Sequence, residues 1–176
     1  AWVYKLDATD ALFLGQTDND AGGRKGIALG YHSERLWVLQ GNGASWSLET
    51  QAGSFARNKW VHIAASRDYS DSKTRYFVDG QLVYTYTNNV NLSADSNNHL
   101  TIGSIDTDSL DWDGYIQDFR IYKGVAKYTE NFFVGSPNPD VLPDTPSGVS
   151  GKSKLDKITK SATGGAVSFP GTTDYI

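Results

Sequence analysis

The chain has 176 residues, with 16 Lys and Arg against 20 Asp and Glu, which gives a formal net charge of −4. This length suits one domain of ordinary size, and an acidic chain without a basic face excludes a nucleic-acid-binding domain. The absence of cysteine excludes a disulfide framework, zinc-cysteine sites and thiol chemistry. No apolar run approaches the ~20 residues that a membrane-spanning helix needs, so membrane insertion is not expected.

The composition favours strands and turns over helices. Glycine occurs 18 times and aromatic residues make up 12% of the chain, whereas glutamate, a residue of helix interiors, occurs only three times. Short segments with alternating or β-branched and aromatic residues recur at the spacing typical of a sandwich or barrel. Ten of them are predicted as strands: 1–6, 11–16, 26–31, 36–40, 45–50, 59–67, 74–78, 82–87, 99–103 and 115–122.

The clearest local prediction is a β-hairpin over residues 76–84. Asp79 and Gly80 stand between two alternating runs. Because an Asp-Gly pair accepts the positive φ angles of a type I′ turn, these two residues are predicted to form its tip.

The pattern predicts an all-β fold, a two-sheet antiparallel jelly-roll β-sandwich over residues 1–134. Short strands with one apolar face must bury that face, and a second sheet is the simplest cover. Residues 135–164 contain prolines, glycines and serines followed by a lysine-rich stretch, so they are predicted to be a solvated linker. Residues 165–176 have the composition of one more strand, a turn and the start of another.

Several segments in this order resemble the laminin G-like branch of the concanavalin A-like lectin/glucanase superfamily. They are KWVHIAASR at 59–67, RYFVDGQLV at 75–83, LTIGS at 100–104 and DGYIQDFRIY at 113–122. The ending GVAKYTENF at 124–132 is similar to the variant found in bacteriophage tail-fibre and other virion proteins and in marine bacterial surface proteins. The resemblance implies a lectin-like, carbohydrate-binding or host-surface-binding module on a virion surface or in an extracellular or cell-surface protein, in a cell-adhesion role, whose partners are a glycan or host surface.

The end of the chain resembles the opening strand of the same family. We therefore expect the C-terminal segment, through Val167 and Phe169, to supply the first strand of a sandwich. The strand either closes its own domain or completes a neighbouring copy. The second alternative gives a runner-up function, a structural repeat or decoration domain that assembles with other copies of the parent protein by terminal-strand exchange.

Catalysis is not expected. Glucanases of the superfamily use paired glutamates on one strand, whereas Glu34, Glu49 and Glu130 are far apart in the sequence. The segment at 43–47 lacks the closing glycine of a serine nucleophile elbow.

Calcium is the one cofactor that the resemblance implies, at two acidic loops on one rim of the sandwich. Calcium prefers several oxygen ligands, which carboxylates on neighbouring loops supply. The alternative is that these residues only close turns. The predicted metal ligands are Asp18, Asp20, Asp106, Asp108 and Asp111.

Aromatic residues near loops are candidates for stacking on sugar rings, and acidic residues for bonding to hydroxyl groups. Tyr31, Trp46, Trp112 and Asp113 form this predicted ligand-binding set. Trp2, Trp37 and Trp60 lie within strand patterns and are predicted to belong to the core.

Overall fold

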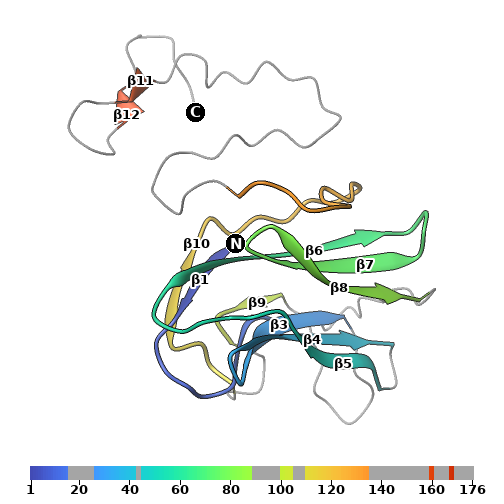
Figure 1. Cartoon of the computed structure of the whole chain (residues 1–176), viewed down its shortest axis with the longest axis horizontal. Coiled ribbons are helices and arrows are strands. Elements are labelled where there is room, and N and C mark those ends of the chain that lie inside the picture. The colour runs from blue at the N-terminus through green and yellow to red at the C-terminus, as the bar shows by residue number, and fades with distance from the viewer. Residues whose placement is uncertain are drawn as a thin grey trace. The chain divides into compact units, whose positions relative to one another are not determined.

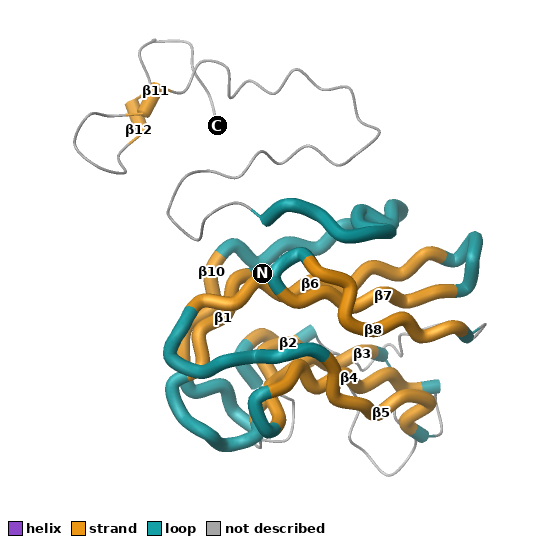
Figure 2. Tube along the Cα trace, in the orientation of Figure 1, coloured by secondary structure: helices purple, strands orange, loops and turns teal. Residues whose placement is uncertain are grey.

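A computed structural model describes residues 1–15, 26–42, 45–88, 100–104 and 110–134, together with the strand residues 159–160 and 167–168. These residues form strands, turns and extended segments, and none of them is helical (Figure 2). The fold is therefore all-β, as the composition predicts. Within the described ranges, nothing helical is long and apolar enough to cross a bilayer.

Two antiparallel five-stranded sheets form the sandwich (Figure 1). Sheet A has the order β10-β1-β6-β7-β8 and sheet B the order β5-β4-β3-β2-β9. The strands of sheet A are β1 (Trp2–Lys5), β6 (Trp60–Asp68), β7 (Lys73–Val78), β8 (Gln81–Thr87) and β10 (Gly114–Gln117). Those of sheet B are β2 (Ala11–Gly15), β3 (Ile27–His32), β4 (Arg35–Gly41), β5 (Trp46–Ala52) and β9 (Thr101–Ile102).

Each of the ten predicted strands has a counterpart in these sheets. The largest difference is in β10, which ends at Gln117 although the pattern predicts a strand to Tyr122. Asp118 has a φ of 53°, which turns the chain out of the extended conformation, and residues 119–122 lie outside any strand.

The predicted hairpin at Asp79 and Gly80 is confirmed. Val78 pairs with Gln81, and the two turn residues have φ angles of 48° and 76°, as a type I′ turn requires. The Asp79 carboxylate also accepts a hydrogen bond of 2.8 Å from the backbone N–H of His62, which ties the turn to β6.

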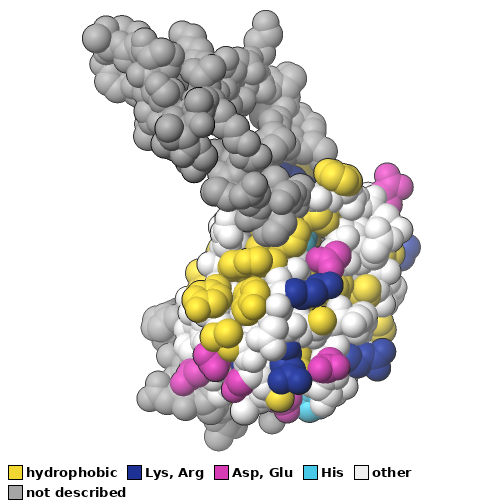
Figure 3. Space-filling view, turned by 60° about the vertical axis from the view of Figure 1, so that its left-hand side comes forward, with side chains coloured by type: hydrophobic (Ala, Val, Ile, Leu, Met, Phe, Trp, Pro, Cys, Tyr) yellow, Lys and Arg dark blue, Asp and Glu magenta, His cyan; other side chains and the backbone are white. Residues whose placement is uncertain are grey.

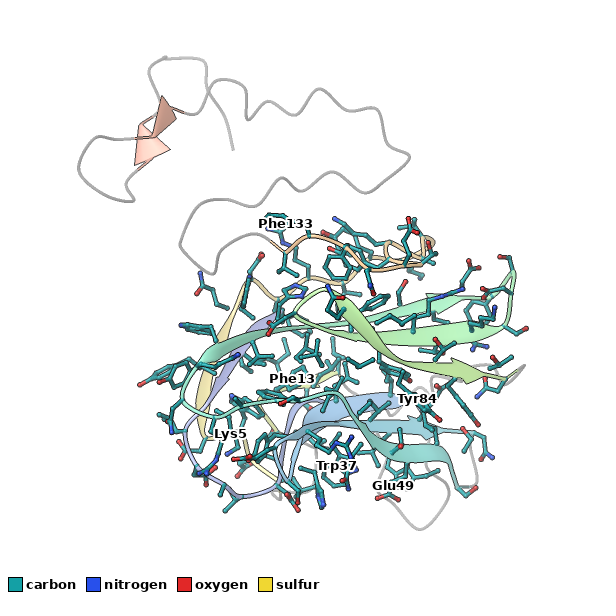
Figure 4. All side chains as sticks on the ribbon, viewed as in Figure 1. Lys5, Phe13, Trp37, Glu49, Tyr84 and Phe133 are labelled. Atoms are coloured by element: carbon teal, nitrogen blue, oxygen red, sulfur yellow. The ribbon has the colours of Figure 1, made fainter. Side chains whose placement is uncertain are left out.

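The core lies between the sheets, as Figure 4 shows for Phe13. Alternate residues of each strand point inward because side chains in a strand alternate between its two faces. Burial of each large apolar side chain contributes roughly 1.5–3 kcal/mol, so this layer provides the main stabilisation. Its members include Val3, Phe13, Leu29, Tyr31, Leu36, Val38, Phe55, Val61, Ile63 and Tyr76.

The chain divides into two compact units, Ala1–Val134 and Gly135–Ile176. In the second unit, β11 (Thr159–Lys160) pairs antiparallel with β12 (Val167–Ser168). β11 lies in the stretch predicted to be linker, where its β-branched threonine suits a strand. Val167 therefore belongs to a strand, whereas Phe169 lies outside the described residues. That this segment supplies a first strand of a sandwich stays a prediction.

Candidate functional site

Three of the predicted ligand-binding residues lie around one buried lysine, at the rim where β1 ends and β10 begins. The Lys5 side chain is completely buried, and its ammonium lies 5.4 Å from the ring centroid of Trp112 and 5.9 Å from that of Tyr31. It contacts the carboxylate of Asp7. Asp113 joins the group through its backbone, because its carbonyl accepts a 3.0 Å hydrogen bond from the N–H of Leu6. Figure 4 shows Lys5 at this end of the sandwich.

The pKa of the Lys5 ammonium is lowered, mainly by burial, while nearby charged groups act on it in both directions. Burial lowers the pKa of Lys5, the carboxylates of Asp113 and Asp10 act in the opposite direction, and the guanidinium of Arg57 lowers it further. The Lys5 ammonium contacts two aromatic rings and one carboxylate and is not exposed to solvent. Its role is therefore to stabilise this end of the sandwich rather than to bind a ligand.

The prediction of Tyr31 as an exposed stacking residue is wrong. Its side chain is only 1% exposed, and its ring packs edge-on against Phe55 with the centroids 5.5 Å apart. The strand alternation that makes β3 a core strand also turns this side chain inward. Trp112 is half-buried against Phe13 and Phe55, at 5.5 and 5.9 Å, so much of its surface also serves the core.

Trp46 lies on the outer face of sheet B. A register shift between Gln40 and Gly41 places Trp46 opposite Gly41, and the half-buried indole packs with Trp37 on a small cluster. That cluster consists of Leu12, Ala28 and Leu39. Trp37, predicted to belong to the core, is thus an outer-face residue.

The calcium prediction falls mostly on Asp18, Asp20, Asp106 and Asp108, which lie outside the described residues. Asp111 is described and exposed. Over the described ranges, no three or more His, Asp or Glu side chains are grouped so that they could hold a metal ion. Calcium binding stays a prediction.

Three aromatic side chains that were not predicted as a site form a cluster on the outer face of sheet A. Tyr4 of β1 pairs in register with Trp60 of β6 on one side and with Tyr115 of β10 on the other. The Tyr4 ring centroid lies 5.6 Å from that of Trp60 and 5.7 Å from that of Tyr115, and the last two are 6.4 Å apart. We call these three residues the aromatic row.

The aromatic row is partly exposed to solvent. Tyr115 is 58% exposed, and Tyr4 and Trp60 are half-buried. Figure 3 looks toward this side of the molecule and shows hydrophobic side chains gathered there, with acidic and basic side chains beside them. Trp60 is therefore a surface residue, and its assignment to the core is wrong.

One pair further along the strands, the same outer face is closed. Trp2 and His62 pair in register, their rings meet edge-on at 5.3 Å, and they are only 7% and 8% exposed. Phe132 lies over this part, with its ring centroid 5.7 Å from His62 and 5.3 Å from Phe77. Burial, helped by the ammonium of the Ala1 N-terminus and by the Arg120 guanidinium, lowers the pKa of His62 to about 3, so this imidazole is neutral at physiological pH.

Residues 128–134, which we call the C-terminal cover, are fixed over β7 and β8. Tyr128 stacks on Phe132 with the ring centroids 3.7 Å apart. The N–H of Phe132 donates a 2.9 Å hydrogen bond to the carbonyl of Gly80, and the side chain of Asn131 accepts one of 2.7 Å from the N–H of Leu82.

Exposed polar residues stand close to the aromatic row in the sequence. Lys59 precedes Trp60, and Asp113 stands two residues before Tyr115; both are exposed, as is Asn58. The three glutamates lie on separate elements: Glu34 in the turn between β3 and β4, Glu49 in β5 and Glu130 in the C-terminal cover.

Two antiparallel five-stranded sheets that pack face to face define a jelly-roll type β-sandwich. Residues 1–130 match the family model described as concanavalin A-like lectin/glucanases superfamily, laminin G-like branch. The chain belongs to this superfamily. Comparisons with curated proteins and with solved structures gave no significant match.

Proposed function

We propose that residues 1–134 form a non-catalytic carbohydrate-recognition module whose binding surface is the aromatic row and its polar border. The observation that carries this proposal is the open triangle of Tyr4, Trp60 and Tyr115. Membership of a superfamily described by lectins and glucanases supports it. We further propose that the module acts on a virion, extracellular or cell surface, where a glycan is the target.

Aromatic rings and mixed polar groups are the chemistry that sugars need. The C–H face of a pyranose ring stacks on an aromatic ring, while its hydroxyl groups bond to nearby donors and acceptors. Tyr115 offers an exposed ring, and the exposed residues Asn58, Lys59 and Asp113, which are close to Trp60 or Tyr115 in sequence, supply both kinds of polar group.

The placement of the acids supports a binding rather than a hydrolytic role. A glycosidase needs two carboxyl groups facing each other across the scissile bond. Glu34, Glu49 and Glu130 come from a turn, a sheet B strand and the C-terminal cover, and none is part of the aromatic row.

The test is binding to a glycan array, followed by titration with the best sugar. Trp60→Ala and Tyr115→Ala should each weaken binding by ~10-fold or more, because each removes a stacking surface. Tyr69→Ala is the matched control: Tyr69 is also 58% exposed, but it stands in the turn after β6, at the other end of that strand from Trp60. Equal loss in all three variants, or no binding to any glycan, would sink the proposal.

A second candidate function is assembly through the terminal strand. Residues 119–122 follow the edge strand β10, have the strand-like sequence FRIY and lie outside any strand, and Ile121 is 63% exposed. We propose that a strand of a neighbouring copy, containing Val167 and Phe169, pairs along this segment. Light scattering should then show that the full chain forms oligomers. Both Ile121→Lys and deletion of residues 161–176 should convert these oligomers to monomers. A full chain that stays monomeric at high concentration would contradict this.

A further inference from the structure

Among the described residues, no lysine or arginine lies over a ring of the aromatic row. Other partly exposed tyrosines do carry a cation of the protein. The Arg67 guanidinium lies 4.8 Å from the ring centroid of Tyr69, and the Lys127 ammonium lies 4.2 Å from that of Tyr122. Because the face of an aromatic ring attracts a positive charge, the aromatic row can accept one from a ligand.

The triangle of ring centroids is small enough for one cation to reach all three rings. Its sides are 5.6, 5.7 and 6.4 Å, and a cation interacts with a ring from within ~6 Å of the ring centroid. A cation above the middle of the triangle meets this limit for each ring at once. The rings are also inclined, Tyr4 by 68° to Trp60 and by 60° to Tyr115, so they surround a compact group better than they stack on a long flat one.

The carboxylate of Asp113 provides a counter-charge close to the aromatic row. Gly114 pairs in register with Lys5, and the N–H of Leu6 donates a 3.0 Å hydrogen bond to the carbonyl of Asp113, so Asp113 stands beside the end of β1. It lies two residues from Tyr115, a step of ~7 Å in an extended chain. Asp113 is exposed and makes no ion pair with another described residue, although its charge acts on the buried Lys5.

The charges around the aromatic row favour a cationic ligand over an anionic one. Lys59, which precedes Trp60, is exposed but lies over none of the three rings. One carboxylate and three rings therefore attract a positive charge, and one lysine repels it. The chain as a whole has a formal net charge of −4, and Figure 3 shows acidic side chains next to the hydrophobic group on this side of the molecule. A uronic-acid or sulfated sugar meets the opposite balance.

We infer that the glycan recognised at the aromatic row is an amino sugar with a free amine, whose ammonium lies over the three rings with Asp113 as its counter-charge. This rests on the carbohydrate function proposed above.

The test compares two oligosaccharides that differ only in charge, the glucosamine trimer and the N-acetylglucosamine trimer. Both are titrated by calorimetry into the full chain at about pH 6, where a primary amine is protonated. The free-amine trimer should bind ~5-fold or more tightly than the acetylated one, and added salt should reduce this ratio. Equal affinities, or tighter binding of the acetylated trimer, would overturn the inference.

One variant pair isolates the counter-charge. Asp113→Asn keeps the shape of the side chain, and it should weaken binding of the free-amine trimer ~3-fold or more while leaving the acetylated trimer unchanged. Glu49→Gln is the matched control, because Glu49 is also exposed but belongs to β5 of sheet B, and its loss changes the net charge by the same amount. Equal weakening by both variants would show that only the overall charge matters, and the inference would fall.

A second variant pair isolates the rings. Tyr115→Leu keeps an apolar side chain without an aromatic face, so the affinity ratio of the free-amine to the acetylated trimer should fall toward one. Tyr69→Leu should leave this ratio unchanged, because Arg67 already lies over Tyr69. An unchanged ratio in Tyr115→Leu would contradict the inference.

The outcomes separate this inference from the broader function. If neutral sugars bind and Trp60→Ala and Tyr115→Ala abolish that binding, but the free amine gives no advantage, the carbohydrate function stands and the amino-sugar inference falls. If no glycan binds, both fall.

Discussion

The outer face of sheet A has two halves that both carry aromatic side chains but differ in how far those side chains are exposed. In one half His62 and Phe77 lie buried against Phe132, with Tyr128 also packed on Phe77, and the buried ring of Trp2 packs on His62. In the other half the rings of Tyr4, Trp60 and Tyr115 contact one another; Tyr115 is exposed, and Tyr4 and Trp60 are half-buried. Both halves carry aromatic side chains on β1 and β6, and residues 128–134 pack on His62 and Phe77 in one of them. We propose that sugar binds at the other half.

The largest effect on stability is expected where the C-terminal cover contacts the turn at Gly80. A Cβ at Gly80 would lie 2.1 Å from the backbone oxygen of Phe132, and the φ of Gly80 is +76°. Gly80→Ala should therefore lower the free energy of unfolding by about 3 kcal/mol or more. Gly124→Ala is the control, because Gly124 has a φ of +85° and open space around it, and it should cost only about 1 kcal/mol in urea denaturation. Similar losses of unfolding free energy in both variants would mean that the C-terminal cover does not pack closely against Gly80.

Removing the Phe132 ring from the C-terminal cover tests how much the covered half contributes to stability. Phe132→Ala deletes contacts with His62, Phe77 and Tyr128 and should lower the free energy of unfolding by about 3 kcal/mol. Tyr115→Ala, on the open half, should cost less than about 1 kcal/mol. If the two variants are equally stable, the halves do not differ in the way described.

The stability of the protein should depend on pH because His62 is buried in the covered half. An unfolded chain protonates His62 near pH 6.5, whereas the folded protein does so only near pH 3. The unfolded state therefore binds more protons in between, and stability should fall as pH drops below 6.5, by up to about 2 kcal/mol at pH 5. His62→Gln should make this decline shallower between pH 6.5 and 4.5, measured by chemical denaturation at each pH. An unchanged slope would show that His62 is not held neutral by burial.

The smallest effect is expected at the rim that supports the open half. Asp7→Ala leaves the buried Lys5 ammonium without its carboxylate and should cost about 1 kcal/mol, moderated because Asp7 itself is partly exposed. Lys5→Met removes the buried charge, keeps the volume and should be better tolerated. A thermal-unfolding comparison in which Lys5→Met is the more damaging change would contradict the view that Lys5 needs Asp7.

The fold was predictable because its determinants are local. Alternation locates the ten strands, and Asp79 and Gly80 specify their turn by φ preferences that belong to the two residues themselves. The end of β10 was not predictable, because the residues after Gln117 have a good strand composition and only the conformation of Asp118 ends the strand.

The candidate site was harder to predict because it depends on which face is covered. Alternation places Val3 and Val61 on one face and Tyr4 and Trp60 on the other, so the signal for an outer aromatic cluster was present in the sequence. Whether that outer face is open depends on where residues 128–134 fold back, a contact between parts of the chain far apart in sequence. The prediction that Tyr31 binds a ligand was wrong for a related reason: proximity to a turn does not determine the direction of a side chain.

The central claim is that the open half, and not the covered half or sheet B, contacts sugar. It is tested most directly by NMR titration of the labelled protein with the best sugar from the array. The largest chemical-shift changes are expected at Tyr115, Tyr4 and the indole of Trp60, and small changes at Phe77 and Tyr128. Shift changes centred on Trp37 and Trp46 would contradict it.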